Sequence, residues 1–172
     1  MEHAFTVGVE EEFQIVDPNT WELRSHVSEL LASSAPAFGD QVKRTNPAPQ
    51  SRPTGYTHVV EVTGPAKTVY ISGQIAFDKD GTIVGAGDMK AQAEQVFKNL
   101  EAALTAAGAT FSDVVKMNSY ITDMSKVQAV RDVRAKYFTT AAPASTFVEV
   151  KGLVRPELLL EIEVVAVTSP QR

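Results

Sequence analysis

Two glutamates, Glu161 and Glu163, are the residues of this sequence best placed for acid–base chemistry. They lie in LLLEIEVVAV (residues 158–167), where every even position is apolar. Alternate side chains of a strand point to opposite faces, so both carboxylates share the face opposite the apolar one, about 6.6 Å apart. If another subunit covers that face, desolvation raises a carboxyl pKa and suits the group to general acid or base catalysis. The alternative is a solvated strand face.

The tripeptide Ser72-Gly73-Gln74 is a second candidate, because it ends the strand-like stretch TVYISGQ. A glycine at this place lets the backbone approach a ligand closely, and its N–H group can donate to an anion. The alternative is a β-bulge or a turn that ends the strand.

Two charged clusters complete the candidates. Arg131 and Arg134 are spaced one helical turn apart, and a guanidinium pair can hold a carboxylate. The alternative is a solvated helix edge beside Asp132. The run Glu10–Glu12 could contribute to a divalent-cation site or simply be solvated. The three histidines are scattered without metal-site spacing, so we expect no metal and no cofactor.

The hydrophobic pattern predicts the elements that must position these residues. Asp88 is the expected N-cap of the first helix and Gly108 its terminator. Ser125 followed by Gln128 is a capping-box pattern that opens the second helix. In chain order the predicted elements are strands 58–62 and 68–77, helix 89–107, strand 114–122, helix 125–138, and strands 145–153 and 158–167.

The order β-β-α-β-α-β-β predicts an α+β fold with both helices on one face of a mixed sheet. In strand 114–122 we expect Val115, Met117 and Ile121 on one face and Lys116, Asn118 and Tyr120 on the other. The other sheet face would carry Phe147, Leu159 and Val165, which favours oligomerisation.

Composition limits the class of protein. The chain has 172 residues, no cysteine and a net charge of -5, which suits one domain with an appendage in a reducing, cytoplasmic setting and argues against nucleic acid as a partner. No apolar run approaches the roughly 20 residues that span a membrane.

We expect an N-terminal hairpin at 1–31, a linker rich in Pro, Ser and Ala at 32–54, and the main domain at 55–172.

Five stretches of the chain carry a family resemblance: Gly55-Tyr56, VYISGQIAFDKDGTIVG, AQAEQVFKNLEAALTAAGATFSDVVKMNSYITDM, Tyr137-Phe138 and PASTFVEVKGLVRPELLLEIEVVAV. Through them about residues 55–168 resemble the RidA/YjgF family of small trimeric proteins, also described as L-PSP endoribonuclease-like. Many members hydrolyse reactive enamines and imines such as 2-aminoacrylate. The resemblance implies a chorismate-mutase-like fold, a homotrimer, and a small-molecule pocket in each subunit interface.

The resemblance assigns pocket roles to four residues. Tyr56 matches a tyrosine near the first strand, where it would close the pocket. Ser72 matches a serine before the Gly-Gln pair, with Gly73 beside it. Glu161 matches the glutamate that positions the attacking water.

Three positions depart from the family pattern. Ser145 stands where the active deaminases have an arginine that binds the substrate carboxylate. Phe147 replaces a cysteine found in many members, and Arg131 replaces an asparagine on the second helix. Loss of a charge-assisted pair should cost about 1.5–3 kcal/mol of carboxylate binding unless Arg131 compensates from a neighbouring subunit.

The N-terminal stretch FTVGVEEEFQIVDPNTWELR resembles the opening of the glutamate–cysteine ligase-like carboxylate–amine ligases. Those catalytic domains are several hundred residues long, so we expect a fusion remnant without ligase activity.

The leading interpretation is therefore a homotrimer that binds a small carboxylate or imino acid and hydrolyses an enamine or imine. The alternative is a non-catalytic small-molecule binding or sensor protein, because the substrate arginine is missing. A third interpretation, RNA cleavage, fits poorly with the acidic charge.

Overall fold

The computed structural model describes residues 41–170. The predicted N-terminal hairpin, with its ligase-like glutamate cluster, lies outside these residues. Central to the described part is a four-stranded mixed sheet. Its strands, in spatial order, are β3 (Lys67–Gln74), β6 (Leu160–Thr168), β4 (Val114–Ile121) and β5 (Ala144–Glu149). Strand β6 runs antiparallel to both its neighbours, and β4 runs parallel to β5.

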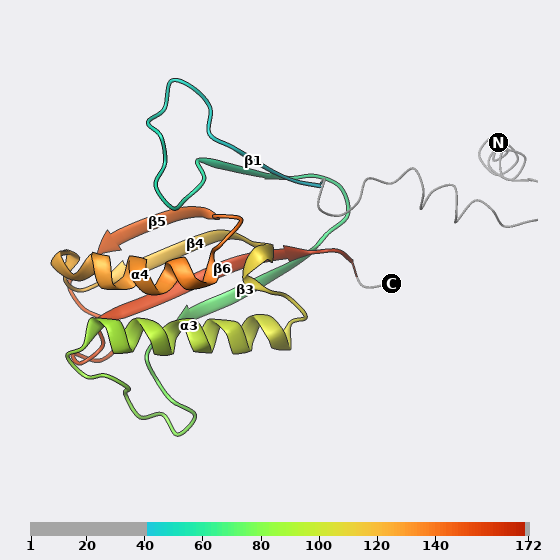
Figure 1. The fold of residues 1–172 in the computed structure, drawn as a ribbon. Coiled ribbons are helices and arrows are strands. Elements are labelled where there is room, and N and C mark those ends of the chain that lie inside the picture. The colour runs from blue at the N-terminus through green and yellow to red at the C-terminus, as the bar shows by residue number, and fades with distance from the viewer. Residues whose placement is uncertain (1–40, 171–172) are drawn as a thin grey trace, which may run out of the picture. The chain divides into compact units, whose positions relative to one another are not determined.

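Two helices, α3 (Met89–Ala106) and α4 (Val127–Tyr137), cover one face of this sheet (Figure 1). Short 3₁₀ turns, η2 (Phe111–Asp113) and η3 (Met124–Lys126), precede β4 and α4. Parallel strands need a crossover connection, and α4 supplies it between β4 and β5. The predicted α+β class, with both helices on one face of a mixed sheet, is confirmed.

The core lies between the helices and the sheet. Position 97 of α3 is fully buried, and the Phe97 ring lies 4.9 Å from that of Tyr137 and 5.9 Å from that of Phe111. The apolar alternation of β6 and the apolar stripe of α3 are both buried as predicted, with these members: Leu158, Leu160, Ile162, Val164 and Ala166 of the β6 stretch, and Met89, Ala93, Val96, Leu100 and Leu104 of α3.

The ends of α3 follow the sequence prediction. The Asp88 carboxylate accepts hydrogen bonds from the N–H groups of Lys90 at 2.9 Å and Ala91 at 3.1 Å, as an N-cap does. Gly108 has φ of +69° just beyond the last turn, a conformation that glycine adopts without strain.

A separate two-stranded sheet joins β1 (Val42–Thr45) to β2 (Val59–Val62) in antiparallel register. Residues 42–45 are therefore strand rather than part of a linker. The strand was missed because four residues are too few to show a period-2 pattern. Although only a short turn separates β2 from β3, the two strands belong to different sheets.

Two local predictions are wrong. A register shift between Val114 and Lys116 buries Val114 fully and Val115 only partly, whereas Met117 and Ile121 are buried on one face as predicted. Ser125 does not cap α4: its N–H and hydroxyl donate to the Asp123 carboxylate at 3.0 and 2.6 Å, and the chain makes the η3 turn before α4 begins.

The face assigned to Phe147 is also wrong. In the parallel register Phe147 pairs with Ser119, which is buried, and its ring packs against the core under the helices. The uncovered sheet face instead carries Val148, which is 39% exposed, and Tyr70, which is 81% exposed. Val165 does line this face, as predicted.

Candidate functional site

Glu161 and Gly73 are in direct contact. A Cβ atom added to Gly73 would lie 2.7 Å from Cδ and 2.9 Å from Cγ of Glu161, closer than real atoms pack. Gly73 does not have a left-handed φ, so its backbone would accept another residue. Glycine is needed here because the Glu161 side chain occupies the space next to its Cα.

The Ser72-Gly73 pair forms an irregularity in β3. Ile71 pairs with Val164 and Gln74 with Ile162, so two residues of β3 oppose one residue of β6. This is the bulge that the sequence left open as an alternative, and bulges often re-aim groups beside functional sites. Ser72 itself is exposed, so its hydroxyl is accessible beside the Gly73–Glu161 contact.

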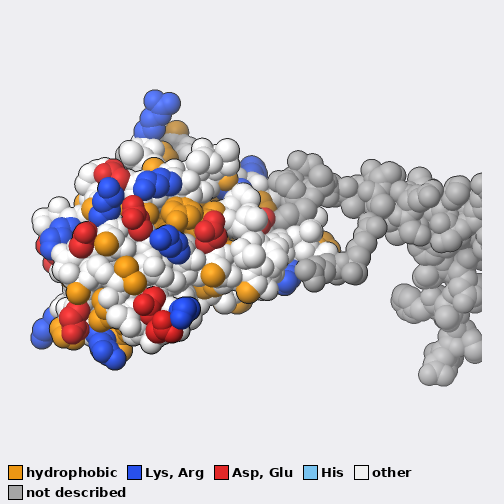
Figure 2. Space-filling model, turned by 60° about the horizontal axis from the view of Figure 1, so that its bottom comes forward, with side chains coloured by type: hydrophobic (Ala, Val, Ile, Leu, Met, Phe, Trp, Pro, Cys, Tyr) orange, Lys and Arg blue, Asp and Glu red, His pale blue; other side chains and the backbone are white. Residues whose placement is uncertain are grey.

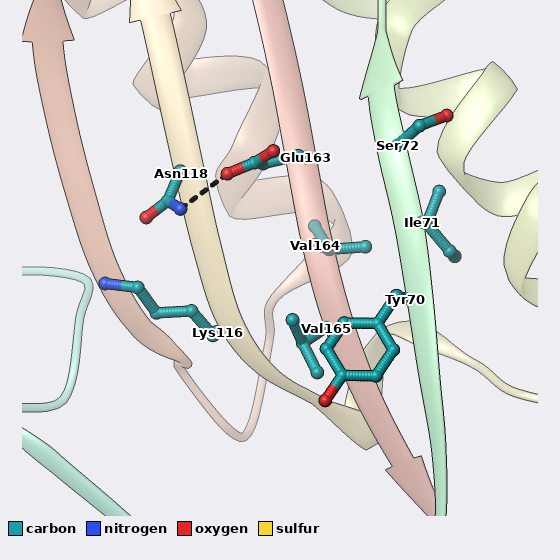
Figure 3. A pocket seen from close by; sticks show the side chains of 8 residues that line it. All are labelled: Tyr70, Ile71, Ser72, Lys116, Asn118, Glu163, Val164 and Val165. Atoms are coloured by element: carbon teal, nitrogen blue, oxygen red, sulfur yellow. Dashed lines mark hydrogen bonds between the residues drawn. The ribbon is translucent and has the colours of Figure 1, made fainter.

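A cavity of about 360 Å³ lies on the uncovered face of the sheet, across β3, β6 and β4 (Figure 3). Ser72 and Tyr70 line it from β3, and Glu163 lines it from β6. At its β4 side the Lys116 ammonium donates to the Thr146 hydroxyl at 2.8 Å, so this positive charge points toward β5 and away from Glu163 (Figure 3).

Glu163 differs from Glu161 in its surroundings. Its Oε1 accepts hydrogen bonds from Asn118 Nδ2 at 2.7 Å and from the Tyr120 hydroxyl at 3.0 Å. The hydrogen bond to Glu163, followed by partial burial and the charges of both glutamates, raises the pKa of Tyr120. Glu163 is thus held in place by two donors, whereas the Glu161 side chain lies against Gly73.

The Tyr120–Glu163 bond gives a test by titration. Glu163→Gln removes the charge that opposes tyrosinate formation, so the pKa of Tyr120 should fall toward its ordinary value. Residue-resolved ¹³C NMR of labelled tyrosines measures this change. Tyr137 is the internal control, because burial is the main cause of its raised pKa. An unchanged Tyr120 midpoint in Glu163→Gln would contradict the assignment.

Gln92, which was not among the predicted residues, holds the start of β6 in place. This buried side chain donates from Nε2 to the carbonyls of Glu157 at 2.7 Å and Gly85 at 3.1 Å, and its Oε1 accepts from the Leu159 N–H at 2.8 Å. Two residues after Leu159 the chain reaches Glu161. Gln92 therefore ties the N-terminal turn of α3 to the segment that positions the candidate catalytic carboxylate.

Gly73→Ala is expected to abolish ligand binding at Glu161 while leaving the fold intact. The added methyl group displaces the Glu161 carboxylate, but the strand backbone tolerates alanine. Circular dichroism checks the fold, and turnover or ligand titration checks the site. Gly152→Ala is the control, since an added Cβ there meets nothing within 4 Å. Equal behaviour of the two variants would remove the reason for a glycine at position 73.

Tyr56 and Ser145 lie at the opposite edge of the sheet from β3. Thr57 pairs with Ala144 at the start of β5, and its N–H donates to the Pro143 carbonyl at 3.0 Å. Ser145 lies in β5 itself and pairs with Met117 of β4, and Tyr56 precedes Thr57 on the outer side of β5. Since β4 separates β5 from β6, these residues are at least about 9 Å from the strand of Glu161.

Arg131 lies in neither group. Together with Arg134 it lines a second cavity, of about 340 Å³, beside α4 and the segment that leads into β5. The structure thus brings Glu161, Gly73 and Ser72 together and separates them from Tyr56, Ser145, Phe147 and Arg131.

In residues 41–170 no group of three or more His, Cys, Asp or Glu side chains is arranged to hold a metal ion. The helices of that part include none long and apolar enough to cross a membrane.

A family model described as Endoribonuclease L-PSP matches residues 47–168 of the chain. The chain belongs to this family. Protein DfrA of Myxococcus xanthus is 39% identical over 113 residues, which are 66% of this chain and 85% of that protein. A RutC family protein of Pyrococcus horikoshii is 42% identical over 99 residues, which are 57% of this chain and 77% of that protein.

Solved structures agree with this membership. A Rid family protein of Yersinia pestis, YyfB, superposes with a TM-score of 0.69 at 34% identity and covers 74% of this chain and 99% of its own. RidA from an Antarctic Psychrobacter species gives a TM-score of 0.56 at 36% identity, over 74% of this chain and 98% of its own. The RidA/YjgF resemblance and the fold that it implied are therefore confirmed.

Proposed function

We propose that this RidA/YjgF protein binds a small enamine or imine and hydrolyses it, with Glu161 as the general base. The observation that carries the proposal is the Glu161 carboxylate packed directly over Gly73, in a bulge that exposes Ser72. A carboxylate beside accessible backbone and hydroxyl donors is an arrangement that can orient both a water molecule and a polar substrate.

The chemistry needs only proton transfers and water. Tautomerisation converts an enamine to its imine. Glu161 accepts a proton from water as the water oxygen bonds to the carbon of the protonated imine, which gives a neutral carbinolamine. The Glu161 carboxylic acid returns that proton to nitrogen. As the C–N bond breaks, the Glu161 carboxylate takes up the hydroxyl proton and passes it to the departing ammonia, which leaves as ammonium, and a ketone or 2-oxo acid remains. No oxidant, metal or cofactor enters this balance.

A second copy of the chain completes the site in this proposal. Glu161 and Ser72 lie toward the β3 edge, whereas Tyr56 and Ser145 lie at β5, so one chain does not bring the two groups together. A head-to-tail interface brings the β5 edge of one copy to the β3 edge of the next, and such interfaces close into rings. The exposed Tyr70 and Val148 on the uncovered sheet face favour a partner there.

Ser145 supports an alternative, a non-catalytic binding or sensor protein. A serine cannot hold a carboxylate as an arginine does, so small imino acids lose a charged anchor unless Arg131 supplies it. RNA cleavage, which the family description suggests, is not proposed. The chain carries a net charge of -5, and the face in Figure 2 shows acidic and basic side chains interspersed.

The deciding experiment generates 2-aminoacrylate with a serine dehydratase and follows pyruvate formation with and without this protein. Acceleration supports the hydrolase. No acceleration by the parent, with a gain in Ser145→Arg, supports the binding protein on an intact scaffold. Loss of acceleration in Arg131→Ala would show that Arg131 takes over the carboxylate. Inactivity of both the parent and Ser145→Arg would refute the hydrolase proposal.

A further inference from the structure

The cavity beside α4 is lined by two arginines and an apolar wall. Arg131 and Arg134 come from one face of the helix, three residues apart. The apolar lining consists of Phe138 with Ala135 and Ala142. The volume of about 340 Å³ is at the lower end of the range for small-molecule sites.

Arg134 is held in a fixed position. Its Nη2 donates to the Gly55 carbonyl, and its guanidinium carbon lies 5.6 Å from the centre of the Phe138 ring. Burial first, and then the positive charge of Arg131, lowers the pKa of Arg134. The side chain stays protonated, because an arginine pKa begins so high. Two guanidinium charges therefore repel each other at the rim of this cavity.

Acidic neighbours do not cancel both charges. Asp132 also lines the cavity, and its Oδ1 accepts a hydrogen bond from Gln128 Nε2 at 2.7 Å. Within residues 41–170 the Arg131 guanidinium has neither an ion pair nor a hydrogen bond to a side chain. Two cations and one anion leave the cavity with one positive charge in excess, which suits a monoanion.

We propose that this cavity is a binding site for a small organic carboxylate. The planar guanidinium of Arg131 matches the two oxygens of a carboxylate, and the fixed Arg134 adds a second donor. The hydrocarbon part of the ligand packs against Phe138 and the two alanines. An inorganic phosphate fits less well, because its negative charge exceeds the one excess positive charge of the cavity. It also has no apolar group to pack against Phe138 and the alanines.

Carboxylate binding in this cavity does not require imine hydrolysis at Glu161. Residues of a single chain form the cavity, and neither Glu161 nor Ser72 lines it. The site can therefore be occupied whether or not the protein is an enzyme, and its occupancy is measured by binding alone.

The test is an NMR titration of the full chain with benzoate at low salt, with benzamide as the neutral analogue of the same shape. We expect saturable shifts of the Gly55, Ala135 and Ala142 amide signals with benzoate and none with benzamide. Arg131→Ala should weaken benzoate binding about tenfold or more, because a charge-assisted pair is lost. Arg131 is exposed, so this variant should fold normally.

Lys136→Ala is the matched control. It removes one positive charge from the same helix, but Lys136 pairs with Glu94 at 3.3 Å and does not line the cavity. Its benzoate affinity should equal that of the parent. Equal losses of benzoate affinity in both variants would mean that only the net charge of the protein matters, and this would overturn the proposal. Shifts at other amides, or equally strong binding of inorganic phosphate to the same amides, would also overturn it.

Discussion

Replacing Glu161 with glutamine should lower kcat/KM for 2-aminoacrylate hydrolysis by about 100-fold or more. Glutamine has nearly the shape of glutamate, so it can occupy the same place over Gly73. Its neutral amide cannot accept a proton from water, and the general-base contribution is lost while substrate contacts remain. The coupled assay with a serine dehydratase measures the change.

Glu101→Gln is the control for this result. Glu101 is an exposed carboxylate on α3 that lines neither the cavity at Ser72 nor the cavity at Arg131, so its replacement makes the same chemical change elsewhere. Turnover by this variant should match the parent. Activity of Glu161→Gln within about twofold of the parent would mean that Glu161 is not the base.

Replacing Gln92 with leucine should lower the free energy of unfolding by about 2–4 kcal/mol. Leucine fits the apolar surroundings of this buried position, but three backbone groups lose their partner: the carbonyls of Gly85 and Glu157 and the N–H of Leu159. Groups left unpaired in a partly buried setting cost more than the apolar side chain gains. Urea denaturation followed by circular dichroism measures the difference.

Gln128→Leu is the matched control, since Gln128 is an exposed helical glutamine whose amide donates only to Asp132. Its unfolding free energy should stay within about 0.5 kcal/mol of the parent. Gln92→Leu should also reduce turnover at temperatures where it remains folded, because Leu159 leads into Glu161. A Gln92→Leu protein as stable as the parent would show that the three bonds contribute nothing net.

The parts of the fold with strong periodicity could be predicted from the sequence. The alternation of 158–167 placed every even residue in the core and both glutamates on the other face, as observed. The stripe of α3, with Asp88 before it and Gly108 after it, fixed that helix at both ends. In both elements burial and local propensity point to the same structure.

Other features depend on pairing between strands and could not be predicted from one segment at a time. Residues 144–149 alternate polar and apolar side chains so weakly that only the register with β4 decides where Phe147 points. The bulge at Val115 changes the expected face of that one residue, and Val114 takes its place in the core. Gln92 had a signal, because a polar residue between Met89 and Val96 lies within the apolar stripe of α3.

Only part of the candidate site could be predicted, because its residues also come together through pairing between strands. Glu161 and Gly73 were singled out on separate strands, but their contact depends on the β3–β6 register and on the bulge between them. The distance of Tyr56 and Ser145 from them follows from the strand order, which places β4 between β5 and β6. A single sequence pattern does not specify that order.

A subunit-mixing experiment addresses the shared site most directly. The Glu161→Gln and Tyr56→Ala variants are each expected to be inactive when measured alone. The two proteins are mixed in equal amounts, unfolded together and refolded. If neighbouring copies contribute Glu161 and Tyr56 to one site, random reassembly restores intact sites at about a quarter of the positions, and activity returns to about a quarter of the parent value. A mixture no more active than the two variants measured apart would contradict a site built between copies of this chain.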